Sequence, residues 1–174
     1  EALREVLGTH VEQKGSFVSP EYLRFDFSHF SKINEEDLKL VEDKVNQKIK
    51  ENIALQEFRD IPMTEAIEKG AMALFGEKYG DEVRMIQFGD SKELCGGTHV
   101  KSTAEIGHFK ILSESSTAAG IRRIEAISGE KSSAYFEELE KEIKNLSQLL
   151  KTKDLGKAVQ NLMAENAQLK TEVD

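Results

Sequence analysis

The sequence predicts an α+β fold, with a mixed or antiparallel sheet and packed helices, followed by a coiled-coil-like helical segment at the C-terminus. Short stretches of alternating apolar and polar residues lie between turns rich in glycine and serine, which is typical of β-strands. These strands and the amphipathic helices do not alternate regularly, so a parallel α/β fold is not indicated. From about Glu130 glycine becomes scarce and apolar residues recur every three or four positions. We therefore expect one domain at residues 1–129 and a helical coiled-coil linker at 130–174.

The first expected elements are the end of a helix at residues 2–7 and a strand at residues 22–27. Gly8 stands where a left-handed residue often ends a helix. Turns are expected around Gly15 and Pro20. The strand should bury one face, formed by Leu23, Phe25 and Phe27.

Asn34 is expected to cap a long helix that packs on the sheet. Its apolar residues recur at spacings of three and four and form one stripe: Leu38, Val41, Val45 and Ile49. After a strand near residues 53–58, Thr64 is a candidate cap for a helix that ends around the glycines at 76 and 80. Three more strands are predicted, at 83–88, 109–112 and 121–127.

The C-terminal helical segment carries two apolar seams. The first consists of Phe136, Leu139, Ile143, Leu146 and Leu150. The second, which includes one asparagine, consists of Leu155, Val159, Leu162, Asn166, Leu169 and Val173. The register changes near Gly156, so we expect either two helices that fold back on each other or one kinked helix that pairs with a partner. Self-association through this segment is therefore an expected property.

Composition and charge exclude several classes of protein. The net charge of −8 argues against broad electrostatic binding of nucleic acid, so any RNA contact must be local or made by another part of a longer protein. No stretch approaches the roughly 18 apolar residues of a membrane span, and residues 1–5 do not resemble a signal peptide. We expect a cytoplasmic protein without membrane contact. Because residues 1–5 resemble the interior of a helix and lack a cap, we also expect residues upstream of Glu1.

The most specific feature of the sequence is Glu-Leu-Cys-Gly-Gly-Thr-His at residues 93–99. The thiolate of Cys95 and the imidazole of His99 are preferred Zn²⁺ ligands, and the glycines between them allow a tight turn. A zinc site needs three or four protein ligands, yet no second pair is evident among His10, His29 and His108. Two other interpretations stay open: a buried Cys95 beside a hydrogen-bonded His99, or a nucleophilic Cys95 with His99 as its base.

Residues 95–99 resemble the second zinc half-motif of the editing domain of alanyl-tRNA synthetases. Other segments agree with that family in the same order along the chain, namely 13–16 (QKGS), 23–29 (LRFDFSH) and 118–126 (AAGIRRIEA). The resemblance covers essentially the whole chain. The editing domain of threonyl-tRNA synthetases is less similar, because it typically has Arg and Pro where this chain has Gly96 and Thr98.

The resemblance implies a zinc-dependent hydrolase that removes serine or glycine from mischarged tRNA for alanine, within an ATP-dependent alanine–tRNA ligase. In that family the zinc would be held by Cys95 and His99 together with two histidines upstream of Glu1. The editing domain is therefore expected to be truncated at its N-terminus. With half of the ligands present, this chain should bind zinc weakly and be inactive alone.

The resemblance also implies residues that contact the substrate or the tRNA, namely Gln13, Thr98, Arg122 and Arg123. The amide of Gln13 can both donate and accept hydrogen bonds. The guanidinium groups of Arg122 and Arg123 are suited to bind the terminal adenosine or a phosphate of the tRNA. Adjacent residues of a strand, however, face opposite sides of the sheet. Only one of the two arginines is therefore expected to reach the site.

Two carboxylates in the predicted strands, Asp26 and Glu125, are conceivable general bases. We instead interpret them as salt-bridge partners of Arg24 or Arg123 and assign no catalytic role to them. His10, His29 and His108 are interpreted as structural or surface residues.

A different class of function stays open beside the enzyme. The helical segment and the acidic charge are also typical of a non-catalytic linker or dimerisation module. Free-standing alanyl-editing proteins are a nearer alternative, although the long helical tail favours part of a full synthetase. Zinc content of a chain extended upstream would discriminate the enzyme from the linker.

Overall fold

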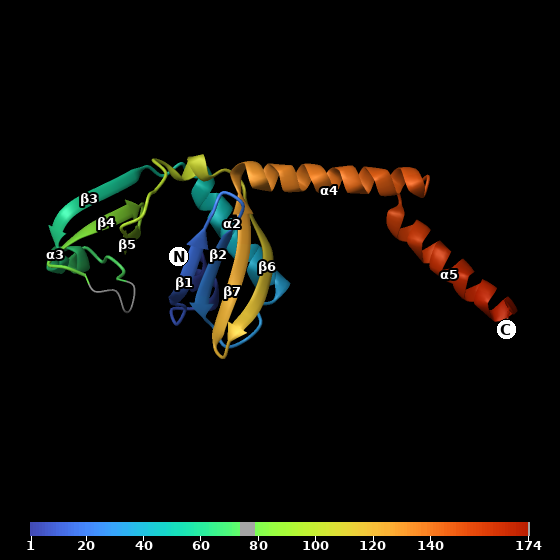
Figure 1. Ribbon diagram of the computed structural model, residues 1–174, viewed down its shortest axis with the longest axis horizontal. Helices are drawn as coiled ribbons and strands as arrows, with labels where there is room; N and C mark the ends of the chain where they lie inside the picture. Colours follow the sequence, from blue (N-terminus) through green and yellow to red (C-terminus); the bar gives the residue numbers. More distant parts are fainter. Residues whose placement is uncertain (74–78, 174) are drawn as a thin grey trace. The chain divides into compact units, whose positions relative to one another are not determined.

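The chain forms two compact units, Glu1–Ser132 and Ser133–Asp174. The computed structural model describes residues 1–73 and 79–173 (Figure 1). The first unit contains helices and two antiparallel sheets, so the predicted α+β class is confirmed. No helix among the described residues is long and apolar enough to cross a membrane.

The larger sheet has four antiparallel strands in the order β1-β2-β7-β6. The strands are β1 (Gln13–Val18), β2 (Leu23–Ser28), β6 (Phe109–Ala118) and β7 (Ile121–Ser128). In β2 the expected apolar face forms, and Phe27 is completely buried. The edge strand β1 occupies residues where we expected a turn around Gly15, because its mostly exposed side chains give no apolar alternation.

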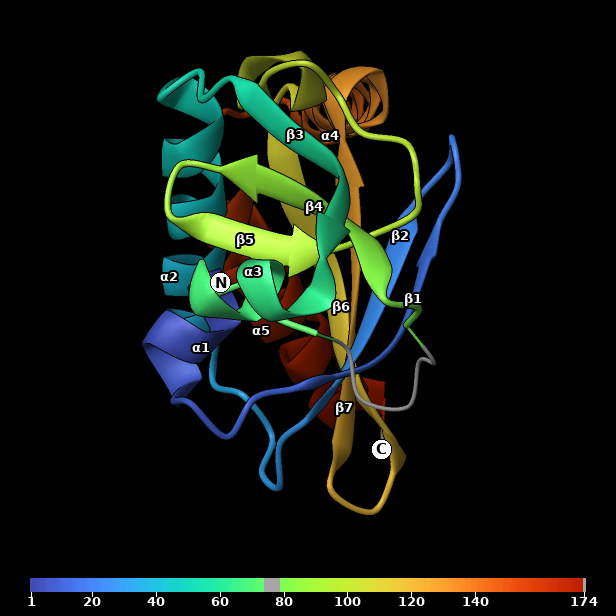
Figure 2. The same cartoon turned by 90° about the vertical axis from the view of Figure 1, so that its left-hand side faces the viewer.

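Helix α2 (Glu35–Lys50) covers one face of this sheet, beside the short helix α1 (Ala2–Leu7) (Figure 2). The predicted cap of α2 is confirmed, because the Asn34 side chain accepts a hydrogen bond of 2.7 Å from the backbone N–H of Asp37. The apolar stripe of α2 faces the sheet and completes the larger core. Its buried residues are Val11, Phe27, Ile33, Val41, Ile49, Phe109, Ile111, Ile124 and Ala126.

The smaller sheet has three antiparallel strands in the order β3-β4-β5, which are β3 (Leu55–Pro62), β4 (Glu82–Phe88) and β5 (Ser91–Leu94). Its core combines these strands with helix α3 (Met63–Glu68) and consists of Ala66, Ala71, Val83, Met85 and Leu94. A short 3₁₀ helix, η1 (Thr103–Ile106), follows the Cys95 loop. Strand β5 was not predicted, because a four-residue strand is too short for a periodic pattern.

The helix predicted from Thr64 to the glycines at 76 and 80 is much shorter in the structure. Pro62 occupies the N-cap position without a side-chain cap, and the helix ends at Glu68. Gly70 has a φ of 82°, a left-handed conformation that stops the helix. Residues 74–78, where the remainder was expected, lie outside the described residues.

The C-terminal helices are α4 (Gly129–Leu149) and α5 (Leu155–Val173). Lys151, between them, has a φ of 51°, which is incompatible with a continuous helix. Several seam side chains are exposed: Phe136, Leu139, Ile143, Leu146, Val159, Leu162 and Leu169. The two helices fit the predicted change of register, and their pairing into a coiled coil stays a prediction.

Candidate functional site

The candidate metal-binding loop, residues 95–99, directly follows β5 and has no regular secondary structure. Cys95 is a partly exposed free thiol. Its Sγ lies 3.6 Å from the position that a Cβ on Gly97 would occupy, so the thiol folds over the middle of the loop. His99 Nδ1 is buried and has no hydrogen-bond partner among the described residues. A buried imidazole nitrogen of this kind is available to a metal ion.

The donor atoms of this loop fit part of a zinc site. A thiol and an imidazole are the preferred ligand types, and the unpartnered Nδ1 of His99 offers a lone pair when that nitrogen is deprotonated. Among the described residues, however, no three His, Cys, Asp or Glu side chains gather closely enough to hold a metal. The loop therefore offers two donors of the preferred types, and the described residues alone do not complete a metal site.

The other histidines are engaged elsewhere in the described structure. His10 Nε2 and His29 Nδ1 share a hydrogen bond of 2.9 Å, and their rings stack with centroids 5.2 Å apart. His108 Nδ1 shares a hydrogen bond of 2.9 Å with the buried Ser132 hydroxyl. These contacts fit the structural and surface roles that we predicted for them.

Gln13 lines a cavity of about 160 Å³ that reaches the strand before the candidate loop. Glu93, two residues before Cys95, lines the same cavity, as do Phe25 and Met72. No hydrogen bond is observed for the Glu93 carboxylate within the described part of the chain. The structure thus brings together two residues that are far apart in sequence. Glu93 was not singled out from the sequence, because strand β5 was not predicted. Had it been, alternation along the strand would have placed Glu93 on the face opposite the buried Leu94.

The two adjacent arginines of β7 face opposite sides of the sheet, as expected. Arg122 lies opposite Phe27 and forms a forked ion pair with Glu114, with Nη2 2.6 Å from Oε2. The Arg122 and Glu114 side chains are only 12% and 2% exposed. Hydrogen bonding to Glu114 raises the Arg122 pKa, which fits a permanently charged structural pair.

Arg123 forms a second forked ion pair, with both contacts to Asp26 at 2.7 Å. The Arg123 hydrogen bond lowers the pKa of the Asp26 carboxyl below its usual value, and this effect exceeds that of burial. The salt bridge that we predicted for Asp26 is therefore present. Glu125 instead accepts a hydrogen bond of 3.2 Å from the Ser113 hydroxyl.

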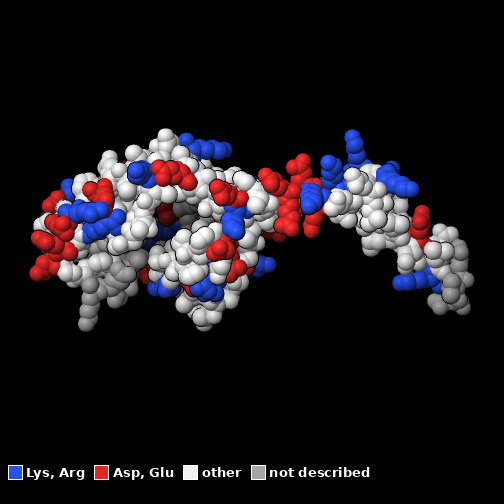
Figure 3. All heavy atoms as spheres, turned by 45° about the horizontal axis from the view of Figure 1, so that its top comes forward, with Lys and Arg blue, Asp and Glu red and all other residues white. Residues whose placement is uncertain are grey.

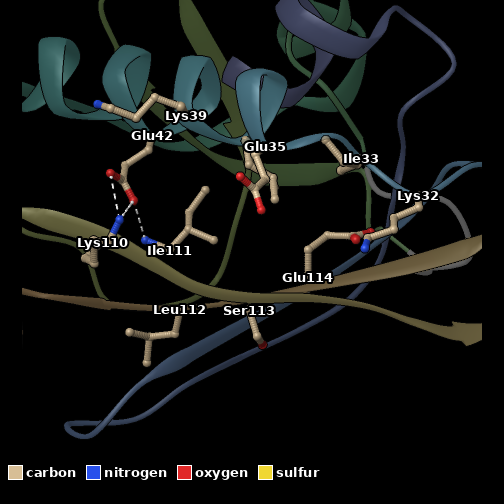
Figure 4. Close-up of a pocket in the computed structure, with 11 residues that line it drawn as sticks. Lys32, Ile33, Glu35, Lys39, Glu42, Lys110, Ile111, Leu112, Ser113 and Glu114 are labelled. Atoms are coloured by element: carbon tan, nitrogen blue, oxygen red, sulfur yellow. Dashed lines mark hydrogen bonds and ion pairs between the residues drawn. The ribbon is translucent and has the colours of Figure 1, made fainter. Parts of the chain in front are cut away.

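A cavity of about 470 Å³ lies between α2 and β6 and contains none of the predicted site residues (Figure 4). Its lining mixes three lysines and three glutamates with apolar side chains. Glu42 bonds Lys110 at 3.0 Å and also accepts from the backbone N–H of Ile111. Figure 3 likewise shows acidic and basic side chains intermixed on the visible face. Neither view contains the continuous basic surface that extended RNA binding would require.

Comparison with known families first defines the class of the site. The family model "Threonyl and Alanyl tRNA synthetase second additional domain" matches residues 83–125, which extend from β4 into β7. This segment contains Arg84, Cys95, His99 and both arginines of β7.

Whole-chain comparisons are more specific. The alanine–tRNA ligase of Flavobacterium psychrophilum is 58% identical over 174 residues, which cover 99% of this chain and 20% of the relative. The corresponding enzymes of Bacteroides fragilis and Porphyromonas gingivalis are 57% and 52% identical, again over 20% of their length. These matches support the identification of the chain as a fragment of an alanyl-tRNA synthetase. The chain spans about a fifth of the length of the relatives it matches.

Proposed function

We propose that the unit Glu1–Ser132 is part of an editing domain that hydrolyses serine or glycine from mischarged tRNA for alanine. The observation that carries the proposal is the loop with a free Cys95 thiol and an unpartnered, buried His99 Nδ1. This loop lies within the segment that matches the synthetase family model.

The chemistry of discrimination explains why such a site is needed. A pocket built for alanine cannot sterically exclude glycine, and a single hydroxyl group rejects serine only weakly, at about 1–3 kcal/mol. A second site that hydrolyses the wrong ester supplies the missing selectivity. The ATP-dependent ligation, the tRNA partner and the cytoplasmic location of the whole protein belong to the same proposal.

Cys95 and His99 would hold a Zn²⁺ ion together with ligands from outside this chain, which the resemblance places on an upstream helix. When bound, zinc supplies Lewis acidity toward the ester carbonyl or toward water. The cavity that Gln13 and Glu93 line would receive the aminoacyl group. There the Glu93 carboxylate complements its cationic α-ammonium, and the Gln13 amide can donate and accept hydrogen bonds.

For the tRNA itself, the predicted contact residues differ in how exposed their side chains are. Thr98 is exposed on the candidate loop, so its hydroxyl is accessible. Arg123 is 26% exposed, whereas Arg122 is 12% exposed in its pair with a nearly inaccessible carboxylate. We therefore assign the RNA contact to Arg123 and a structural role to Arg122.

The exposed seams of α4 and α5 favour a second function, self-association. Exposed apolar residues at three- and four-residue spacing are typical of helices that pair. Sedimentation of the chain should show a concentration-dependent oligomer, which Leu146→Lys should weaken. A monomer at high concentration would contradict this second proposal.

Deacylation by a full-length synthetase that contains this segment tests the editing proposal. Cys95→Ala should lower hydrolysis of serine-charged tRNA by at least about 10- to 100-fold, because a metal ligand matters at least as much as its supporting contacts. Aminoacylation with alanine is the internal control and should persist. Unchanged hydrolysis would contradict the editing assignment.

A further inference from the structure

Strand β4 carries an arginine that binds the backbone of the candidate loop. Arg84 Nη1 donates hydrogen bonds to the carbonyl oxygens of Cys95 at 2.9 Å and of Gly97 at 2.5 Å. In addition, the Cys95 backbone N–H donates to the Arg84 carbonyl oxygen at 3.2 Å. One residue thus contacts the loop on both sides of Gly96.

The loop needs such contacts because its sequence is conformationally free. Gly96 and Gly97 lie side by side, and fixing the backbone of one residue costs about 1–2 kcal/mol of entropy, more for glycine. Apart from its two chain neighbours, no described residue has an atom within 4 Å of the position that a Cβ on Gly96 would occupy, so side-chain packing does not fix this residue. Hydrogen bonds to the flanking carbonyls are the restraint that the structure provides.

We infer that Arg84 is a positioning residue that holds the Cys95–His99 loop in one conformation before any metal binds. A guanidinium can direct one nitrogen at two carbonyls while its Nε bonds a carboxylate. The Cys95 and Gly97 carbonyls are held at one nitrogen, which restrains the backbone between them and fixes where the ligand-bearing residues begin. Its role in editing rests on the function proposed above.

A carboxylate on β3 orients the arginine. Arg84 Nε donates to Glu57 Oε1 at 2.5 Å, and both side chains are 25% exposed. Hydrogen bonds from Arg59 and Arg84 lower the pKa of Glu57, so this carboxyl is ionised at neutral pH. Residues from β3 and β4 therefore converge on the loop that follows β5.

The chain offers a matched control for this inference. Arg59 Nε also bonds Glu57 Oε1, at 2.8 Å, but its side chain is 70% exposed and no contact of it with the loop is observed. Like Arg84→Gln, Arg59→Gln removes one positively charged partner of the Glu57 carboxylate. Effects specific to Arg84→Gln therefore report on the loop and not on the ion pair.

The first experiment measures ¹⁵N order parameters of Gly96 and Gly97 in the metal-free 174-residue chain. Wild type and Arg59→Gln should approach the rigid value of about 0.85, whereas Arg84→Gln should fall below about 0.6. Arg84→Lys should be intermediate, because an ammonium keeps the charge but lacks the planar fork. Equal order parameters in wild type and Arg84→Gln would overturn the inference.

A second experiment separates this inference from the proposed function. In the full-length synthetase, Arg84→Gln should weaken zinc affinity and editing by about 10- to 100-fold, with an unfolding midpoint matching that of Arg59→Gln. If Cys95→Ala leaves editing unchanged while Arg84→Gln still loosens the loop, the assignment of the loop to the editing site fails and the positioning role of Arg84 stands. Unchanged zinc affinity in Arg84→Gln would overturn its role toward the metal.

Discussion

The two sheets of the first unit hold their functional segments by different means. Among the described residues, the core between the larger sheet and α2 contains nine buried residues, whereas the core of the smaller sheet contains five. The candidate loop follows the smaller sheet and is restrained by hydrogen bonds from Arg84. The difference shows that apolar packing supports the domain while polar contacts shape the loop.

The largest expected effect lies in the larger core. Phe27→Ala should lower the free energy of unfolding by about 3–5 kcal/mol, because Phe27 is completely buried beneath α2. Urea denaturation of the chain measures this loss. Phe30→Ala, at a side chain that is 90% exposed, is the control and should change stability by at most about 0.5 kcal/mol. Similar losses for both variants would contradict the assigned core.

A smaller and more local effect is expected in the second core. Met85 is completely buried in β4, so Met85→Ala should cost about 2–5 kcal/mol in the stability of the smaller sheet. Hydrogen exchange should accelerate more in β3–β5 than in β2 and β7. Uniform acceleration across both sheets would show that they unfold as one cooperative body and would weaken the comparison.

The smallest effect concerns the ion pair on the larger sheet. The Asp26 pKa is lowered in the folded state, so the pair with Arg123 stabilises the fold above the unfolded pKa of about 3.9. This stabilisation is lost as pH falls through the folded pKa. Arg123→Gln should therefore cost up to about 1 kcal/mol at pH 7, and this cost should shrink as pH falls through the folded pKa of Asp26.

Asp26→Asn provides the matched control for this pair. The double variant should cost little more than either single variant, because both remove the same interaction. Additive losses at pH 7 would show that Asp26 and Arg123 act independently.

Elements with a clear apolar period were predictable from the sequence. The stripe of α2 and the Asn34 cap reflect local rules, and the buried face of β2 follows from alternation. Strand β5 and the early end of α3 were not predictable in this way, because tertiary contacts determine such short elements. The edge strand β1 was missed for another reason, because its mostly exposed side chains give no apolar alternation.

For the site, the motif predicts Cys95 and His99 as ligands through their residue types, and this assignment stays a prediction. The contact that holds Cys95 comes from Arg84 on another strand, which no local pattern shows. Arg84 lies 11 positions before Cys95 and contacts it across neighbouring strands. Glu93 and Gln13, from different sheets, line one cavity only because of the tertiary fold.

The central claim is that Cys95 and His99 belong to the zinc site of an editing domain. Anomalous X-ray scattering at the zinc edge, from crystals of a full-length synthetase containing this segment, tests it most directly. The account predicts one zinc ion in contact with Cys95 Sγ and a ring nitrogen of His99, completed by ligands outside this chain. Zinc bound by His10, His29 or His108, with Cys95 and His99 in separate environments, would contradict it.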